Sequence, residues 1–306
     1  MAGYWPPLSR PVSHFLRHDG ASESRIKVWE RYYGFSEIRL ASEVGTTEQL
    51  LAAVSGLTTV RGSERRVEHL LHARTMPAAT PYPVSTVHEL RHLLGLNHAA
   101  AFCVSSQACA SGLLAVDLAG RLLAAGDDPD ALALVITGEK VFTPGGRVIP
   151  DVGVMGECTA ALLIGLDGPH DRVLSYACRT QGEFEASLSV SRTLTDDIRR
   201  NYPTALAAVI SEAVDKAGLT MAEIDLILPH NVNRMSWAPI FRALGIRNGT
   251  ERIFWDNLAL IGHCFGADAF LNYLAAVERG RLQRGMRYLM TAVGDGDTFA
   301  AMLLQH

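Results

Sequence analysis

The chain has 306 residues, 48% of them hydrophobic, with 27 glycines and 13 prolines, a composition typical of a globular α/β protein with a sizeable core. A formal net charge of −4 without a basic block excludes an electrostatic case for nucleic-acid binding. We expect no membrane-spanning run and no signal peptide, and five cysteines without a CxxC spacing favour a reduced, cytoplasmic protein.

The first 45 residues are the hardest to interpret, because three early prolines interrupt regular structure. Residues 27–34 are aromatic and basic, which fits either a half-buried amphipathic helix or a surface for a nucleotide or partner. The elements expected next are a helix over residues 46–57, a strand over 67–73, a proline-rich irregular loop over 75–83 and a helix over 84–94.

The chain is organised around residues 100–126. A short apolar run of strand character leads through a polar turn to Cys109, and the segment after it is apolar on nearly every face, which is typical of a buried helix. At such a helix start, free amide donors and the helix dipole favour a thiolate. The residues alone leave open that Cys109 is only a small core side chain, because free cysteine is among the most buried residue types.

The second half repeats the order of strands and buried helices. The expected elements are strands over residues 131–137 and 159–164, a helix over 203–217 with its proline at the start, a strand over 224–228, a helix over 234–244, an extended segment over 252–260, a helix over 267–279 and closing strands over 288–293 and 298–304.

This recurrence indicates an internal duplication. The number of residues between Cys109 and His263 is nearly the same as that between Gly138 and Gly294. We therefore expect an N-terminal half, residues 1–167, and a C-terminal half, residues 168–306. Two such α/β halves would place their strand-to-helix turns at one end of the molecule, where sites form in open α/β sheets. His230, after a strand of its own, would face the same crevice. Either histidine alone would be read as structural, but the shared location favours a function.

Three motifs stand in a fixed order: Cys109 within SSQACASG, His230 within PHNVNR, and Gly262-His263 before a helix of small residues. This ordered set resembles the thiolase superfamily, and most of all its β-ketoacyl-acyl-carrier-protein synthase III branch, also called ketosynthase III. The resemblance covers residue 46 to the end, and is weak before that, where the family's opening strand and glycine turn are missing. It implies a thiolase-like fold, with two duplicated α/β halves in a layered αβαβα arrangement, and a homodimer.

The resemblance also implies roles for individual residues. Cys109 would be the nucleophile, His230 and His263 would be catalytic, and Asn233 would support His230. The remaining implied positions are an active-site turn at Gly294, Asp295 and Gly296, a segment near the acyl pocket and dimer interface that contains Pro81 and Tyr82, a CoA or pantetheine contact at Trp29 and Arg31, and Gly156-Glu157-Cys158 in place of the family's G-D-G.

Two departures from the family pattern bear on the reaction. His263 replaces the family asparagine; elongating ketosynthases of the superfamily use the resulting Cys-His-His set for decarboxylative condensation, whereas relatives with altered sets transfer acyl groups to oxygen or nitrogen. Asp295 and Asp297 put acidic side chains beside an anionic intermediate, which is unfavourable unless they point away or pair with a histidine.

The implied enzyme is an acyltransferase that takes an acyl group from acyl-CoA or an acyl carrier protein onto Cys109, with backbone amides of Cys109 and the closing turn binding the oxyanion. We expect decarboxylative Claisen condensation with a malonyl thioester, in fatty-acid-like or polyketide biosynthesis, with no cofactor beyond the CoA or phosphopantetheine thioester substrates. The alternatives are acyl transfer to a hydroxyl or amine of a small molecule, and a catalytically silent heterodimer partner. A metal site at Cys109, His230 and His263 would lack a local ligand pair.

Overall fold

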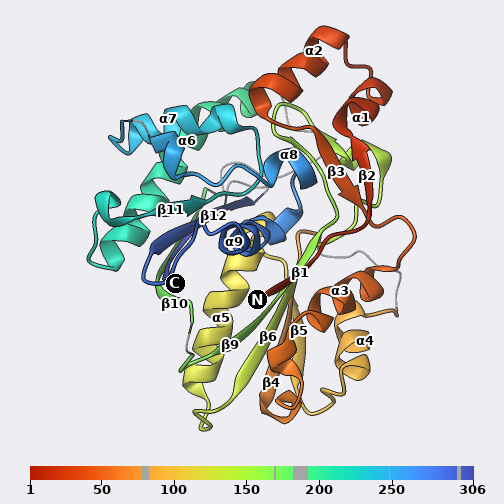
Figure 1. Cartoon of the computed structure of the whole chain (residues 1–306), viewed down its shortest axis with the longest axis vertical. Helices are drawn as coiled ribbons and strands as arrows, with labels where there is room; N and C mark the ends of the chain where they lie inside the picture. Colours follow the sequence, from red (N-terminus) through yellow and green to blue (C-terminus); the bar gives the residue numbers. More distant parts are fainter. Residues whose placement is uncertain (77–82, 169, 182–191, 248, 295–297) are drawn as a thin grey trace.

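The structure, a computed structural model, describes residues 1–76, 83–168, 170–181, 192–247, 249–294 and 298–306. Two main sheets, one from each half of the chain, form its frame (Figure 1). The first has the strand order β1-β9-β6-β4-β5 and comprises β1 (Ala2–Tyr4), β4 (Val67–Ala73), β5 (Ala100–Val104), β6 (Leu132–Thr137) and β9 (Thr159–Gly165). The second has the order β10-β13-β12-β11 and comprises β10 (Arg172–Thr180), β11 (Leu226–Leu228), β12 (Arg287–Gly294) and β13 (Thr298–Gln305). The predicted division at residues 167 and 168 falls between β9 and β10.

Parallel pairs lie inside each sheet and carry the turns that lead to the site. β4 runs parallel to β5 and β6, with Leu71 opposite Phe102 on one side and Val135 on the other. β11 runs parallel to β12 in the same way, while β9 and β13 are antiparallel to their neighbours. Since both faces of these strands are covered, they read as nearly continuous apolar runs.

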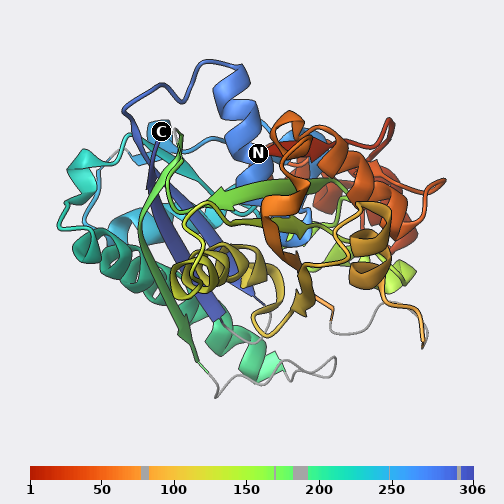
Figure 2. The same ribbon diagram turned by 90° about the horizontal axis from the view of Figure 1, so that it is seen from below.

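Helices form three layers around the two sheets, which confirms the αβαβα arrangement. The layers are α3 (Thr46–Ser55) and α4 (Thr86–Leu93), then α5 (Ser111–Ala125) and α9 (Asp268–Glu278), then α6 (Arg192–Lys216) and α7 (Trp237–Ala243). Successive residues of one strand face different layers: Leu70 packs with α3 and α4, whereas Leu71 packs with α5 and α9 between the sheets. Figure 2 shows the same order from below, with teal α6 and orange α3 on opposite sides.

The N-terminal region forms a separate lobe above the first sheet. It contains β2 (Leu8–Pro11), α1 (Val12–His18), α2 (Glu23–Val28), the π-helical turn η1 (Trp29–Tyr33) and β3 (Glu37–Leu40). The opening strand that the sequence was thought to lack is present, because β1 pairs antiparallel with β9, with Gly3 opposite Ala160. That prediction was wrong because a three-residue edge strand is too short to show an alternating pattern.

Short elements complete the chain. They are η2 (Thr58–Val60), η3 (Glu64–Arg66), η4 (Ala108–Ala110), η5 (Pro144–Gly146), β7 (Val148–Ile149), β8 (Gly153–Val154), η6 (Met221–Glu223), η7 (Arg234–Ser236), η8 (Gly249–Arg252), α8 (Leu258–Ile261) and η9 (Phe265–Ala267). Most predicted elements are found within a few residues of their expected bounds, and the strand over residues 67–73 is confirmed at both ends.

Three further sequence-based expectations need correction. The segment expected to be extended over residues 252–260 contains no strand and ends in the helix α8. α6 begins at Arg192, so Pro203 lies inside the helix and not at its start, at the cost of a backbone hydrogen bond. Ala108–Ala125 is apolar and long enough to cross a membrane, although no such run was expected. Half of that window is buried, and its side chains pack between the two sheets, so its hydropathy is that of a core helix.

Candidate active site

Cys109 lies in η4, the turn that joins β5 to α5, and is 8% exposed. Ala108 before it has a φ of 45°, a left-handed conformation that few side-chain-bearing residues adopt, so the chain bends sharply at the thiol. Thr75, just after β4, donates a hydrogen bond from Oγ1 to Cys109 Sγ at 3.3 Å. The apolar neighbours of the thiol are Val141, Met155 and Phe265.

His263 contacts the thiol directly. Its backbone is fixed beside β8, where the amide of His263 donates to the Val154 carbonyl at 2.9 Å. Gly262 permits this approach, since it has a φ of 68° and an added Cβ would lie 2.5 Å from that same carbonyl oxygen. The imidazole hydrogen-bonds Cys109, and its Nδ1 is hydrogen-bonded to Asp268.

The charge state of His263 follows from these two neighbours. Burial by itself lowers the pKa of His263, but the Asp268 carboxylate and the Cys109 sulfur outweigh it and raise the pKa well above its ordinary value of 6.5. At neutral pH the ring is therefore an imidazolium, which puts a positive charge beside the Cys109 sulfur.

Asp268 completes a Cys-His-Asp arrangement that the sequence analysis missed. It is the first residue of α9, is 2% exposed, and accepts hydrogen bonds from the amides of Cys264 and Asn231, both at 2.6 Å. These two donors, at the N-terminus of α9, hold the buried carboxyl group in place. The available sequence signal was an aspartate at the start of a small-residue helix, five positions after a histidine.

His230 lies after β11 and is 2% exposed. Its Nε2 is 2.6 Å from the hydroxyl of Tyr202, on α6. Burial, and then the positive charge of His263, lower the pKa of His230 to about 3. The two histidines therefore carry different charges at neutral pH: His263 is an imidazolium and His230 a neutral imidazole.

The other predicted site residues are placed as follows. Asn233 holds the loop after His230, since its Oδ1 accepts from the Met235 amide and its Nδ2 donates to the Asp151 carbonyl, both at 2.8 Å. Gly294 ends β12 against the cysteine turn, where an added Cβ would lie 2.0 Å from the Gln107 carbonyl oxygen. Four predicted positions lie outside the described residues: Pro81, Tyr82, Asp295 and Gly296.

Comparisons with known proteins give the relatives of this chain. Residues 214–306 match the family described as "3-Oxoacyl-[acyl-carrier-protein (ACP)] synthase III C terminal". Beta-ketoacyl-[acyl-carrier-protein] synthase III of Acidiphilium cryptum is 26% identical over 291 residues, which cover 89% of this chain and 87% of the relative. The Aquifex aeolicus protein of the same name is 25% identical over 280 residues, which cover 89% and 88%.

Solved structures extend the match to the whole fold. The crystal structure of 3-oxoacyl-[acyl-carrier-protein] synthase III from Aquifex aeolicus has a TM-score of 0.82 at 23% identity, covering 100% of this chain and 98% of that one. ChlB3, an acyltransferase, has a TM-score of 0.84 at 17% identity, covering 99% and 95%. The chain is ketosynthase III-like: residues 214–306 match that family's model, and the whole chain has the fold of its solved structures. It is accordingly an acyl-transferring enzyme.

The two halves of this ketosynthase III-like enzyme present equivalent turns. η4 leads into α5 as η9 leads into α9, and Phe265, with a φ of 56°, corresponds to Ala108. Gly266 therefore stands where the first half has Cys109, and His263 precedes that position by three residues. The two turns pack directly on each other, since a Cβ added at Gly112 would lie 2.5 Å from the Gly266 carbonyl oxygen.

Trp29 does not fit the predicted CoA or pantetheine contact in this ketosynthase III-like enzyme. It is 2% exposed, with its ring packed 5.1 Å from that of Tyr33 and 5.6 Å from that of Phe35. A core indole offers no free face to a ligand. Arg31 is exposed, and its carbonyl accepts a hydrogen bond from Arg234, so its contact with substrate stays a prediction.

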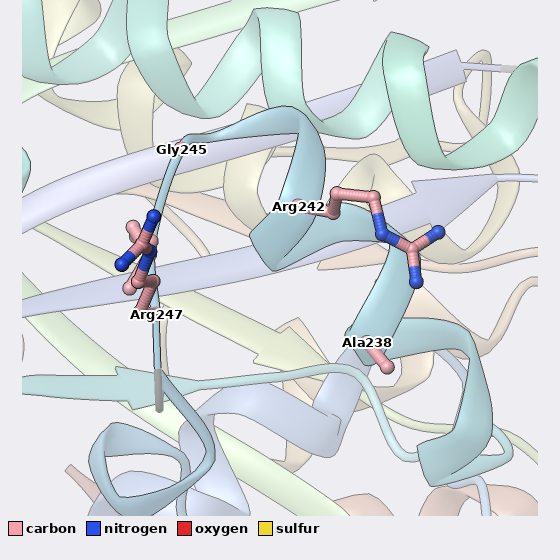
Figure 3. Close-up of a pocket in the computed structure, with 5 residues that line it drawn as sticks. Ala238, Arg242, Gly245 and Arg247 are labelled. Atoms are coloured by element: carbon pink, nitrogen blue, oxygen red, sulfur yellow. The ribbon is translucent and has the colours of Figure 1, made fainter.

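A surface pocket of about 470 Å³ lies away from the chemistry of this ketosynthase III-like enzyme. It is formed by α7 and the turn after it, lined by Ala238, Arg242, Gly245, Ile246 and Arg247. Figure 3 shows the guanidinium groups of Arg242 and Arg247 on two sides of it. In the part of the chain that the structure describes, no group of three or more His, Cys, Asp and Glu side chains is arranged to hold a metal ion.

Proposed function

We propose that this enzyme takes an acyl group from a CoA or carrier-protein thioester onto Cys109 and transfers it to a hydroxyl or amine of a small molecule. The observation that carries the proposal is the His263–Asp268 pair beside the thiol. A carboxylate on the far nitrogen of an imidazole supports repeated gain and loss of a proton at the near nitrogen.

In the first half-reaction the Cys109 thiolate attacks the thioester carbonyl. The tetrahedral intermediate collapses with cleavage of the original C–S bond, and the departing CoA or carrier thiolate takes the proton of the His263 imidazolium. The amide of Cys109 and the backbone of Gly294, held against the cysteine turn, are the candidate donors to the oxyanion. The product is an acyl-cysteine next to a neutral His263.

In the second half-reaction the acceptor enters as an alcohol or amine. His263 removes its proton while the oxygen or nitrogen attacks the acyl carbon, and the C–S bond to Cys109 breaks to release the ester or amide. Asp268 stabilises the imidazolium that forms, so the thiolate–imidazolium pair of the resting enzyme is restored. His263 thus gives one proton to the departing thiolate and regains one from the acceptor.

A second candidate is the decarboxylative condensation that the sequence favoured. Two histidines near the thiol and the names of the relatives, beta-ketoacyl-[acyl-carrier-protein] synthase III, support it. It asks both rings to donate hydrogen bonds to one thioester oxygen, and it uses Asp268 only to hold His263 and the loop after His230. Fatty-acid or polyketide context, the homodimer and the cytoplasmic location remain predictions.

Intact mass spectrometry of the full chain tests the proposal. With a panel of acyl-CoAs and acyl carriers, the wild type should gain one acyl mass that Cys109→Ala does not gain. The acyl-enzyme is then divided between a panel of alcohols and amines and a malonyl thioester. Loss of the acyl mass with formation of an ester or amide supports the proposal. Release of CO2 with a β-ketoacyl product overturns it in favour of condensation, and the absence of any adduct overturns both.

A further inference from the structure

Thr75 touches the nucleophile but has no role in the chemistry described so far. It follows β4, the strand that lies between the parallel strands β5 and β6, and Cys109 comes after β5. The carboxyl ends of neighbouring parallel strands therefore bring the two side chains to one edge of the sheet. The Thr75 hydroxyl is hydrogen-bonded to Cys109 Sγ, with 3.3 Å between the two atoms.

The backbone around Thr75 is held from both sides. Toward β5, the amide of Arg74 donates to the carbonyl of Val104 at 2.9 Å. Toward β6, the carboxyl group of Glu139 accepts from the amides of Thr75 and Met76, the latter at 3.1 Å. Glu139 is 2% exposed, and one of its oxygens is 3.7 Å from Nε of Arg74. These bonds fix the position from which the hydroxyl reaches the sulfur.

The reaction sets the direction of the hydrogen bond between Thr75 and Cys109. A sulfur that is bonded to an acyl group, or has just been released from one, carries no hydrogen, so it accepts and the hydroxyl donates. The hydroxyl also lies near the Glu139 carboxyl group, which already accepts from two amides. A hydroxyl hydrogen rotates to suit its neighbours, and as the acyl-cysteine breaks down the neighbour that gains negative charge is the sulfur.

His263 is engaged elsewhere during that step. In the second half-reaction its imidazole takes the proton of the acceptor, so the ring faces the attacking oxygen or nitrogen while the C–S bond breaks. The departing sulfur then gains from a second donor, and the Thr75 hydroxyl is already in contact with it.

We propose that Thr75 is a further catalytic residue, which donates a hydrogen bond to the Cys109 sulfur as the acyl group leaves, and that Glu139 is its positioning residue. The C–S bond breaks, its electron pair stays on sulfur, and the hydroxyl keeps its proton. The inference rests on the acylation of Cys109 in the proposed function and applies to any acceptor that takes the acyl group.

The test compares the wild type with Thr75→Val, with Thr75→Ser, which keeps a hydroxyl, and with Thr59→Val, the same change at an exposed threonine. Each protein is loaded from an acyl-CoA that acylates the wild type, freed of acyl-CoA and treated with hydroxylamine, whose nitrogen takes the acyl group. Intact mass follows the loss of the acyl group, and urea-denatured acyl-enzyme gives the uncatalysed rate. Thr75→Val should lose the acyl group about tenfold more slowly than the other three, since a hydrogen bond to a charged group is worth that or more.

The rate of loading separates this role from a structural one. It should fall by less than about threefold in Thr75→Val, because a sulfur anion that loses a donor is less stable but more nucleophilic. Equal discharge by Thr75→Val and the wild type overturns the inference, as does slow discharge by Thr75→Ser or an equal slowing of loading and discharge.

A second variant covers the case in which Thr75→Val does not fold. Thr75→Ala then takes its place with the same expected rates, and failure of both variants to fold would make the hydroxyl a structural group and overturn the inference. Failure of the proposed function is distinct, because in that case the wild type itself gains no acyl mass from any thioester.

Discussion

The Asp268 carboxylate is hydrogen-bonded to Nδ1 of His263, and the same carboxylate binds the amides of Cys264 and Asn231. One side chain at the start of α9 thus fixes the histidine that touches the nucleophile and the loop that follows the second histidine. The pair also raises the pKa of His263 well above its ordinary value.

Asp268→Asn should therefore disable the proton transfers, and it should also cost stability because one buried amide loses its acceptor. Without the carboxylate the pKa of His263 falls, the imidazolium no longer supports the thiolate at neutral pH, and acyl transfer should drop on the order of 10²–10⁴-fold. Iodoacetamide alkylation of the Cys109 peptide at pH 7 should be slower in Asp268→Asn than in the wild type. Asp117→Asn, which breaks an ion pair to Arg121 on α5, is the control. An unchanged alkylation rate in Asp268→Asn would refute the assigned pairing.

Gly294→Ala should slow acyl loading of Cys109 by displacing the backbone beside it. A Cβ there would meet the Gln107 carbonyl oxygen at 2.0 Å, so either β12 or the turn that carries Cys109 must shift. Misplacement by about an ångström typically costs about 10²-fold in rate. Gly120→Ala is a matched control in α5, where an added Cβ meets nothing within 4 Å. It should keep full loading and stabilise the helix by about 0.5–1 kcal/mol, measured by chemical denaturation. Normal loading by Gly294→Ala would contradict the close approach.

His72→Gln should make the free energy of unfolding depend less on pH in the acid range. Burial, and then the charge of Arg74, lower the pKa of His72 in β4 to about 4. As pH falls below 6.5 the unfolded chain binds a proton there that the folded chain does not bind, so the wild type loses stability down to about pH 4. Over that window the loss from this residue is about 3 kcal/mol.

The measurement is the free energy of unfolding by urea at several pH values. Its slope between pH 6.5 and 4 should be smaller for His72→Gln than for the wild type, whatever the offset between the two curves. His88→Gln, at an exposed histidine, should keep the wild-type slope. Parallel curves for all three proteins would show that His72 is protonated in the folded state.

Much of the frame could be predicted, because strand and helix periods are local. The apolar run, turn and buried helix around Cys109 placed that residue at the start of α5, and the repeat of this order placed His263 near the start of α9. Asp268 and Tyr202 were missed for different reasons. The role of Asp268 depends on burial, which a single sequence does not show. Tyr202 was left in a loop because the helix was expected to begin at Pro203, one residue later, whereas α6 begins at Arg192.

At Trp29 the sequence predicted a ligand contact, whereas the structure has a core side chain. An aromatic and basic segment fits both a ligand surface and a half-buried helix, and composition does not say which face is covered. The lobe of α1, α2 and β3 packs over the indole and makes it core. The sequence pattern therefore placed Cys109 at the start of a buried helix but did not show which residues contact it, since those contacts join distant elements.

The close packing of Gly112 on Gly266 has a consequence for biosynthesis. Cys109 meets His263 only when the turn before α9 has docked against the turn before α5. While the ribosome is still making the second half, the sulfur lacks this partner. A chain truncated before α9 should therefore react with thioesters more slowly than the complete chain.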